Sequence, residues 1–325
     1  MLRLTPYRWL RPGSAAEAAA LLAEAPAETM AIAGGTDLVP NMKHRLFTPA
    51  RLVALRSLPE LRGIRVENGW LSIGAGESLT AVAAHADVRR HAPALAEAAA
   101  HVAGPQLRNM GTLGGNVCLD TRCTYYNQTF FWRQALGFCL KKDGDVCHVT
   151  KVGKKCVAAH SADTPPVLMT LGAELDFVGA RGGRTSSIDD FFVADGIQNQ
   201  RRAPDEILTR IRIPIDPARR SAYAKLRQRN AIDFPLLTVA VSARFEESGA
   251  VESLDGVMTA LGSRPRRLTG WEAAAGQRLD ADLIEHLAER AHAQCHPLEN
   301  LIVDPEWRRA MVPVQVRRAL ERLAS

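Results

Sequence analysis

The chain has 325 residues, of which 46% are hydrophobic and 23% are charged. These values exclude a disordered or fibrous chain, and the length predicts about two domains. The net charge of +6 is small for this length, so it gives no reason to expect a nucleic-acid partner. No apolar run approaches the ~18 residues of a membrane span. Because Glu17 and Glu24 also interrupt the apolar N-terminal stretch, no signal peptide is predicted. We therefore expect a cytoplasmic protein with no membrane contact and with reduced thiols.

The N-terminal region alternates short strands with helices. Ser14 and Glu17 have the spacing of a capping box, which predicts a helix over residues 14–25. The Asn68-Gly69 pair lies between two alternating segments and predicts a hairpin with a type I′ turn. In chain order we expect strands at 30–33 and 51–55, the hairpin at 64–73, two helices within 78–103 and a loop at 104–116.

Beyond residue 160, alternating segments predict mostly strands, and the last elements are helical. We expect a helix near Leu168, strands at 174–178 and 207–213, a linker at 213–221, strands at 222–229, 236–245 and 251–261, and helices at 280–294 and 305–323. The predicted fold class is α+β. An N-terminal domain would cover residues 1–215, and a sheet-plus-helix domain would cover residues 216–325.

Five of the six cysteines lie within residues 118–156. This window also contains six of the 18 aromatic residues, and its seven lysines and arginines outnumber its three aspartates. The flanking segments are rich in alanine and leucine, so the window is predicted to be an insertion. Its cysteines are Cys118, Cys123, Cys139, Cys147 and Cys156, and only Cys295 lies elsewhere.

Three interpretations of this window compete. Disulfides are disfavoured where thiols stay reduced, and structural zinc usually shows close pairs of cysteines, which the window lacks. An iron–sulfur cluster needs four thiolates that the fold brings together from any spacing. The spacing favours a cluster over zinc only slightly, and it does not choose between Cys118 and Cys123. Buried cysteines without a ligand are common in cores, but they fit a polar, lysine-rich segment poorly.

Two glycine-rich segments carry small polar side chains. Backbone N–H groups in such segments can form a concavity that binds the oxygens of a pyrophosphate. Neither segment is a Walker A motif or a G-x-G-x-x-G motif, and a single Gly-Gly pair is most often a tight turn. The first contains Ala33, Gly34, Gly35, Thr36, Asp37 and Leu38, and the second contains Thr112, Gly114, Gly115 and Asn116.

These segments carry a resemblance to a known family. The sequence AGGTDL at 33–38, the sequence GPQLRNMGTLGGN at 104–116 and Asp163 before an apolar helix resemble the flavin subunit of the molybdenum hydroxylases. That family includes xanthine dehydrogenase and carbon monoxide dehydrogenase. The resemblance covers nearly the whole chain, including PRRLTG at 265–270. It implies a two-part FAD-binding domain of the vanillyl-alcohol-oxidase type, followed by an α/β C-terminal domain.

The resemblance also implies roles for individual residues. Residues 33–37 and 112–116 would hold the FAD pyrophosphate and nearby groups, and Asp163 would contact the adenosine or ribityl part. Lys225 would lie near the flavin ring, although a solvated position on a strand is an equal alternative for it.

Most members of the family lack a cysteine-rich insert. The insert in this chain resembles that of the β subunits of 4-hydroxybenzoyl-CoA reductases, which carries a 4Fe-4S cluster. This match implies that Cys118 is not a ligand. The ligands that it implies are Cys123, Cys139, Cys147 and Cys156.

In that family the flavin subunit conducts electrons and performs no substrate chemistry. The resemblance implies that a ferredoxin-type donor reduces the 4Fe-4S cluster, which passes electrons to FAD. A small subunit with two 2Fe-2S clusters would carry them to a large molybdopterin subunit, which reductively dehydroxylates 4-hydroxybenzoyl-CoA. The implied assembly is a dimer of heterotrimers. Lysines of the window, at positions 141, 142, 151, 154 and 155, would attract an acidic ferredoxin.

Other functions stay open at this stage. The complex would be a xanthine-dehydrogenase-like hydroxylase if electrons flowed outward from substrate. A structural zinc module is a second alternative. A free-standing flavin oxidase is less favoured, since no set of nucleophile and base is apparent. No catalytic role is assigned to His101, His148 or His160.

Overall fold

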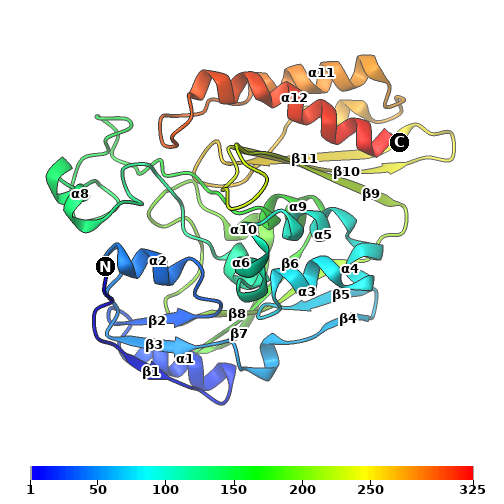
Figure 1. Ribbon diagram of the computed structural model, residues 1–325. Helices are drawn as coiled ribbons and strands as arrows, with labels where there is room; N and C mark the ends of the chain where they lie inside the picture. Colours follow the sequence, from blue (N-terminus) through cyan, green and yellow to red (C-terminus); the bar gives the residue numbers. More distant parts are fainter. Residues whose placement is uncertain (1, 325) are drawn as a thin grey trace.

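The computed structural model describes residues 2–324 and contains three β-sheets (Figure 1). The smallest sheet is parallel, with the order β1 (Arg8–Leu10), β3 (Arg51–Ala54), β2 (Thr29–Ile32). Helix α1 (Ala15–Glu24) packs on it through a stripe of alanines and Leu22. As the capping box predicts, the hydroxyl of Ser14 accepts a hydrogen bond from the Glu17 N–H at the start of α1.

The second sheet is antiparallel and has five strands. Their order is β4 (Ile64–Glu67), β5 (Trp70–Gly74), β8 (Ile207–Pro214), β6 (Glu174–Gly179), β7 (Gly182–Ser187). The predicted hairpin is confirmed, because Asn68 and Gly69 between β4 and β5 have φ values of 49° and 79°. Only these two residues of the turn need a positive φ, and Asn and Gly adopt it most readily.

The third sheet is antiparallel and C-terminal. Its order is β12 (Arg266–Arg267), β11 (Val251–Thr259), β10 (Leu237–Phe245), β9 (Arg219–Leu226). Helices α11 (Ala281–Ala293) and α12 (Pro305–Ala324) cover one face (Figure 1). Helices α5 (Pro93–Ala100) and α9 (Thr164–Thr170) contact the other face. Because both faces are covered, most of β10 is buried.

The main hydrophobic core lies between the second and third sheets. It joins Ile211 of the five-stranded sheet to Leu95 of α5, Leu168 of α9 and Val257 of the C-terminal sheet. The helices of this middle layer are short, and small side chains such as Ala98 and Ala99 let them pack closely. The remaining helices and single turns are α2 (Leu38–Lys43), η1 (Pro59–Leu61), α3 (Leu79–Ala84), α4 (Ala86–His91), α6 (Pro105–Met110), α7 (Leu113–Val117), α8 (Phe130–Leu136), α10 (Ile188–Phe191) and η2 (Glu272–Ala274).

The cysteine-rich insertion projects from the sheets and contains α8 (Figure 1). The buried guanidinium of Arg133 pairs with Asp143 at 3.0 Å and donates to the carbonyl of Arg45 at 3.0 Å. On another side, the Thr124 N–H donates to the carbonyl of Asn300 at 2.9 Å. The insertion is therefore attached both to the N-terminal region and to the segment before α12.

Three expectations about helices and linkers were wrong. Residues 78–103 form three helices, because His85 caps α4 and Pro93 opens α5. Residues 104–116 are not a loop, since Pro105 opens α6 and Thr112 caps α7. The linker is shorter than 213–221, because β8 runs through Pro214 and β9 begins at Arg219. Within residues 2–324, no helix is both long enough and apolar enough to cross a membrane.

Candidate functional site

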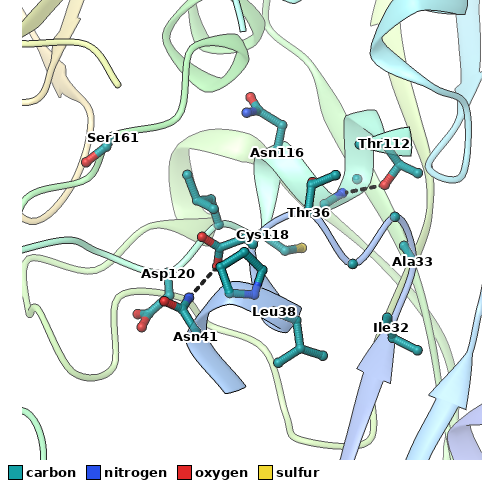
Figure 2. Close-up of a pocket in the computed structure, with 18 of the residues that line it drawn as sticks. Ile32, Ala33, Thr36, Leu38, Asn41, Thr112, Asn116, Cys118, Asp120 and Ser161 are labelled. Atoms are coloured by element: carbon teal, nitrogen blue, oxygen red, sulfur yellow. Dashed lines mark hydrogen bonds between the residues drawn. The ribbon is translucent and has the colours of Figure 1, made fainter. Parts of the chain in front are cut away.

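A cavity of about 730 Å³ lies between the small parallel sheet, α6, α7 and the insertion. Its volume falls in the usual range for the binding site of a small organic molecule. Every predicted residue of the two glycine-rich segments lines this cavity, and so does Asp163. Figure 2 shows Ala33 and Thr36 of the first segment close to Thr112 and Asn116 of the second.

The first segment turns sharply where β2 ends. Gly35 has a φ of +70°, which favours glycine. At Gly34 a Cβ would lie 2.0 Å from the carbonyl oxygen of Met110, so only glycine fits. This close approach of two backbones joins the first segment to the loop between α6 and α7.

The second segment is fixed by hydrogen bonds of its own polar side chains. The Thr112 hydroxyl accepts from the N–H of Gly115 at 3.0 Å, which caps α7. The Asn116 side-chain oxygen accepts from the N–H of Thr164 at 3.1 Å and from its hydroxyl at 2.7 Å. At Gly114 a Cβ would meet Ala75 at 2.7 Å. The cavity wall is therefore held rigidly against α9 and β5.

The side of the cavity nearest the insertion is charged. Asp37 pairs with the guanidinium of Arg122 at 3.2 Å and accepts from the side-chain amide of Asn41 at 3.0 Å. Burial raises the pKa of Asp37, although Arg122 opposes that rise. Arg122 also lies over the ring of Phe234, 3.9 Å from its centre. This arrangement places a cation from the insertion in the wall of the cavity.

Asp163 is buried at the back of the cavity. It accepts a hydrogen bond from the Tyr223 hydroxyl at 2.6 Å and pairs with the Lys225 ammonium at 2.9 Å. Burial raises the pKa of Asp163 even against the attraction of Lys225. Because the Lys225 side chain is only 1% exposed, it is not the solvated strand residue of the alternative interpretation. Lys225 is not among the residues that line the cavity, and it contacts Asp163 from behind.

A second, much smaller cavity of about 20 Å³ lies inside the insertion. All four predicted ligand cysteines line it, whereas Cys118 lines the large cavity. No three His, Cys, Asp or Glu side chains in residues 2–324 lie close enough together to hold one metal ion. The four cysteines around the small cavity are Cys123, Cys139, Cys147 and Cys156.

The thiols of the small cavity differ in their surroundings. Burial, together with smaller contributions from the neighbouring thiols, raises the pKa of Cys123 to about 12. Burial also raises the pKa of Cys147, but hydrogen bonds from Thr150, Val149 and Val157 outweigh it, so that this pKa lies below the ordinary value. The site therefore already contains donors that would stabilise a thiolate at Cys147.

The sequence alone did not identify several residues in these walls. Asn41, Ser161 and Asp120 line the large cavity, and Tyr126 lies between the two cavities. Their only sequence signal was proximity to a glycine-rich segment or to the cysteines, and proximity does not distinguish a wall residue from a solvated one.

Comparison with known proteins assigns the fold and the family of the chain. Residues 5–216 match the model of the FAD-binding domain in molybdopterin dehydrogenase, and residues 221–323 match that of the carbon monoxide dehydrogenase flavoprotein C-terminal domain. The chain is an FAD-binding subunit of the molybdenum hydroxylase family. The predicted α+β fold with an FAD-binding region and a C-terminal sheet-plus-helix region is thereby confirmed.

Individual relatives align with this flavin subunit over almost its full length. The carbon monoxide dehydrogenase medium chain of Hydrogenophaga pseudoflava is 29% identical, and the alignment covers 97% of this chain and 96% of the relative. The aldehyde oxidoreductase FAD-binding subunit PaoB of Escherichia coli is 30% identical, with 88% of this chain and 91% of the relative covered. A solved carbon monoxide dehydrogenase from H. pseudoflava superimposes with a TM-score of 0.80 at 28% identity, covering 99% of this chain and 98% of that chain.

We expect Gly34→Ala to reduce the FAD content of the flavin subunit. The added Cβ would overlap backbone atoms of Met110, so the two glycine-rich segments must separate at a cost of about 1–3 kcal/mol. The measurement is the ratio of FAD absorbance to protein after gel filtration. Gly13→Ala is the matched control, because its Cβ meets only an ordinary contact with Glu17 at 3.5 Å. Full FAD content in Gly34→Ala would contradict the role of this close approach.

Lys225→Met should destabilise the fold, because it leaves the Asp163 carboxylate buried without its cation. Loss of one partner of a buried pair costs about 3–5 kcal/mol. The free energy of unfolding in urea measures this loss, and Lys43→Met, at an exposed position, should change little. The double variant Asp163→Asn with Lys225→Met should recover part of the stability. The single variant Asp163→Asn completes the cycle, and the pair would not be coupled if the effects of the two single substitutions added up to the effect of the double variant.

Proposed function

We propose that this flavin subunit receives low-potential electrons through a 4Fe-4S cluster in residues 118–156 and passes them to FAD. One observation carries this proposal. Of the chain's six cysteines, four line the small cavity of the insertion, and they are the four that the sequence resemblance implies as cluster ligands.

The donor set around the small cavity fits an iron–sulfur cluster. Four thiols line one cavity, and no carboxylate among residues 2–324 lines it. In a four-iron cluster each thiolate binds a different iron, so the sulfur atoms stand farther apart than around a single ion. Cys123, Cys139, Cys147 and Cys156 would hold the four irons, and the N–H and hydroxyl donors around Cys147 would lower the negative charge on its sulfur.

The large cavity is where we place FAD. The segments 33–38 and 112–116 would hold the pyrophosphate, and Asp163 would contact the adenosine or ribityl part. Lys225 would act through Asp163, which it pairs with, rather than by touching the cofactor. When bound, FAD accepts and donates one or two electrons and so connects one-electron centres to two-electron chemistry.

The partners follow from the same proposal. The relatives are named medium chains and FAD-binding subunits of larger enzymes. This chain would accordingly work with a large molybdopterin subunit and a small subunit with two 2Fe-2S clusters, as a dimer of heterotrimers. The large subunit would reductively dehydroxylate 4-hydroxybenzoyl-CoA. The same proposal includes two domains, which cover residues 1–215 and 216–325, and a cytoplasmic location.

The opposite direction of electron flow is the second candidate. The names of the relatives favour it, since they include a carbon monoxide dehydrogenase and an aldehyde oxidoreductase. Reduction of NAD by the complex with an N-heterocycle or an aldehyde would support this candidate. Reduction of FAD by a ferredoxin, with no NAD reduction, would support the first.

The deciding experiment measures iron, acid-labile sulfide, zinc and FAD in protein purified without oxygen. We expect about four iron and four sulfide with one FAD per chain. Cys139→Ser should lose the iron and keep the FAD, because the FAD segments lie outside the insertion. Cys295→Ser is the matched control, since Cys295 is buried in the C-terminal core and does not line the small cavity. Zinc in place of iron would be consistent with an FAD-binding subunit, but it would contradict the proposed 4Fe-4S cluster and the reductase function.

Docking of an acidic donor should depend on salt. Lys151, Lys154 and Lys155 are exposed, whereas Lys141 is buried and cannot contact a partner, contrary to the sequence-based expectation. The double variant Lys154→Ala with Lys155→Ala should slow the second-order reduction by ferredoxin about tenfold at low ionic strength and less at high ionic strength. Lys43→Ala is the control. A rate that does not change between low and high salt would exclude electrostatic docking.

A further inference from the structure

Two side chains, Tyr126 and Lys141, line both the large cavity and the small cavity. They therefore form the wall between the place of FAD and the place of the cluster. Both are buried, with the side chain of Lys141 5% exposed and Tyr126 3% exposed. The Lys141 ammonium lies over the ring of Tyr126, 4.7 Å from its centre.

The ammonium of Lys141 is fixed by three acceptors. It donates to the Asp120 carboxylate at 2.7 Å, to the Thr121 hydroxyl at 2.7 Å and to the Gly196 carbonyl at 2.5 Å. The second oxygen of Asp120 accepts from the Tyr126 hydroxyl at 3.2 Å. A lysine with all three donors used in this way cannot swing out to solvent, so its charge stays in the wall.

Lys141 interacts with polar or charged groups of the large cavity and of the small cavity. Asp120 and Arg122 interact electrostatically, and Arg122 pairs with Asp37 of the first glycine-rich segment. On the other side, burial raises the pKa of the Cys156 thiol, and the positive charge of Lys141 opposes that rise. One buried ammonium thus acts on groups of both cavities.

We propose that Lys141, balanced by Asp120, is a positioning residue that sets the reduction potential of the 4Fe-4S cluster and thereby the driving force for electron transfer to FAD. This inference rests on the proposed function, because it requires the cluster and FAD in their two cavities. Lys141 itself is neither oxidised nor reduced.

The sign of the effect follows from electrostatics. Reduction adds one negative charge to the cluster, and a nearby buried cation stabilises that charge more strongly than an exposed cation does. Loss of Lys141 should therefore lower the potential, and it also leaves the Asp120 carboxylate uncompensated. Loss of the Asp120 charge should raise the potential, because Lys141 is then no longer balanced.

The experiment compares variants of the anaerobically purified protein by redox titration monitored by electron paramagnetic resonance. Lys141→Met should shift the equilibrium for cluster reduction about tenfold toward the oxidised form, which corresponds to about 59 mV for one electron. Asp120→Asn should shift it in the opposite direction. Lys142→Met is the matched control. Lys142 is the next lysine in the sequence, but its side chain is 39% exposed and pairs with Asp143. The reduction potential of the cluster should therefore change little in this variant.

Two further comparisons test the inference even if Lys141→Met does not bind the cluster. Lys141→Arg keeps the charge and should restore a potential near that of the wild type. If Lys141→Met loses its iron, then Asp120→Asn and Lys141→Arg decide. An unchanged or lowered potential in Asp120→Asn, or equal shifts in Lys141→Met and Lys142→Met, would overturn the inference while the proposed function stands. Wild-type protein without iron would overturn both.

Discussion

The contact between the backbone at Gly34 and the carbonyl of Met110 is the constraint on which the large cavity depends. It joins the end of a parallel strand to the loop between two short helices, and no side chain could fit between them. Both glycine-rich segments are thereby brought to one wall, although more than 70 residues separate them in the sequence. The other walls of the cavity are positioned relative to this contact between Gly34 and Met110.

Ion pairs with at least one buried partner fix other parts of the structure. Asp163 with Lys225 ties α9 to the C-terminal sheet, and Arg133 with Asp143 holds the insertion together. Such pairs contribute little net stability, because desolvation of the two charges offsets their attraction. They do fix geometry, since any rearrangement would leave a charge buried alone. These ion pairs therefore fix the positions of the side chains more than they contribute to the free energy of folding.

Much of the fold could be predicted from local patterns in the sequence. The capping box at Ser14, the Asn68-Gly69 turn and the alternating strands of the C-terminal sheet are short-range signals, and the structure contains each of them. The helices at 105–110 and 113–117 were missed because their glycines were interpreted as breakers. Gly111 in fact separates the two helices, and Gly114 is required by the approach of Ala75. Tyr126 and Lys141 could not be predicted as wall residues, since that role depends on two cavities that only the folded chain creates.

The way in which the insertion is attached has a consequence for how such a unit can be exchanged. Arg133 reaches the carbonyl of Arg45, Lys141 and Thr121 reach the carbonyl of Gly196, and the N–H of Thr124 reaches the carbonyl of Asn300. In each of these contacts the group outside the insertion is a backbone carbonyl, but position 196 also requires glycine, because a Cβ there would lie 2.6 Å from the sulfur of Cys156. The surface around the insertion also supplies side chains, since Asp37 pairs with Arg122 and the ring of Phe234 lies under the same guanidinium. Exchange of such a unit would therefore require matched changes at positions outside it, among them 37, 196 and 234.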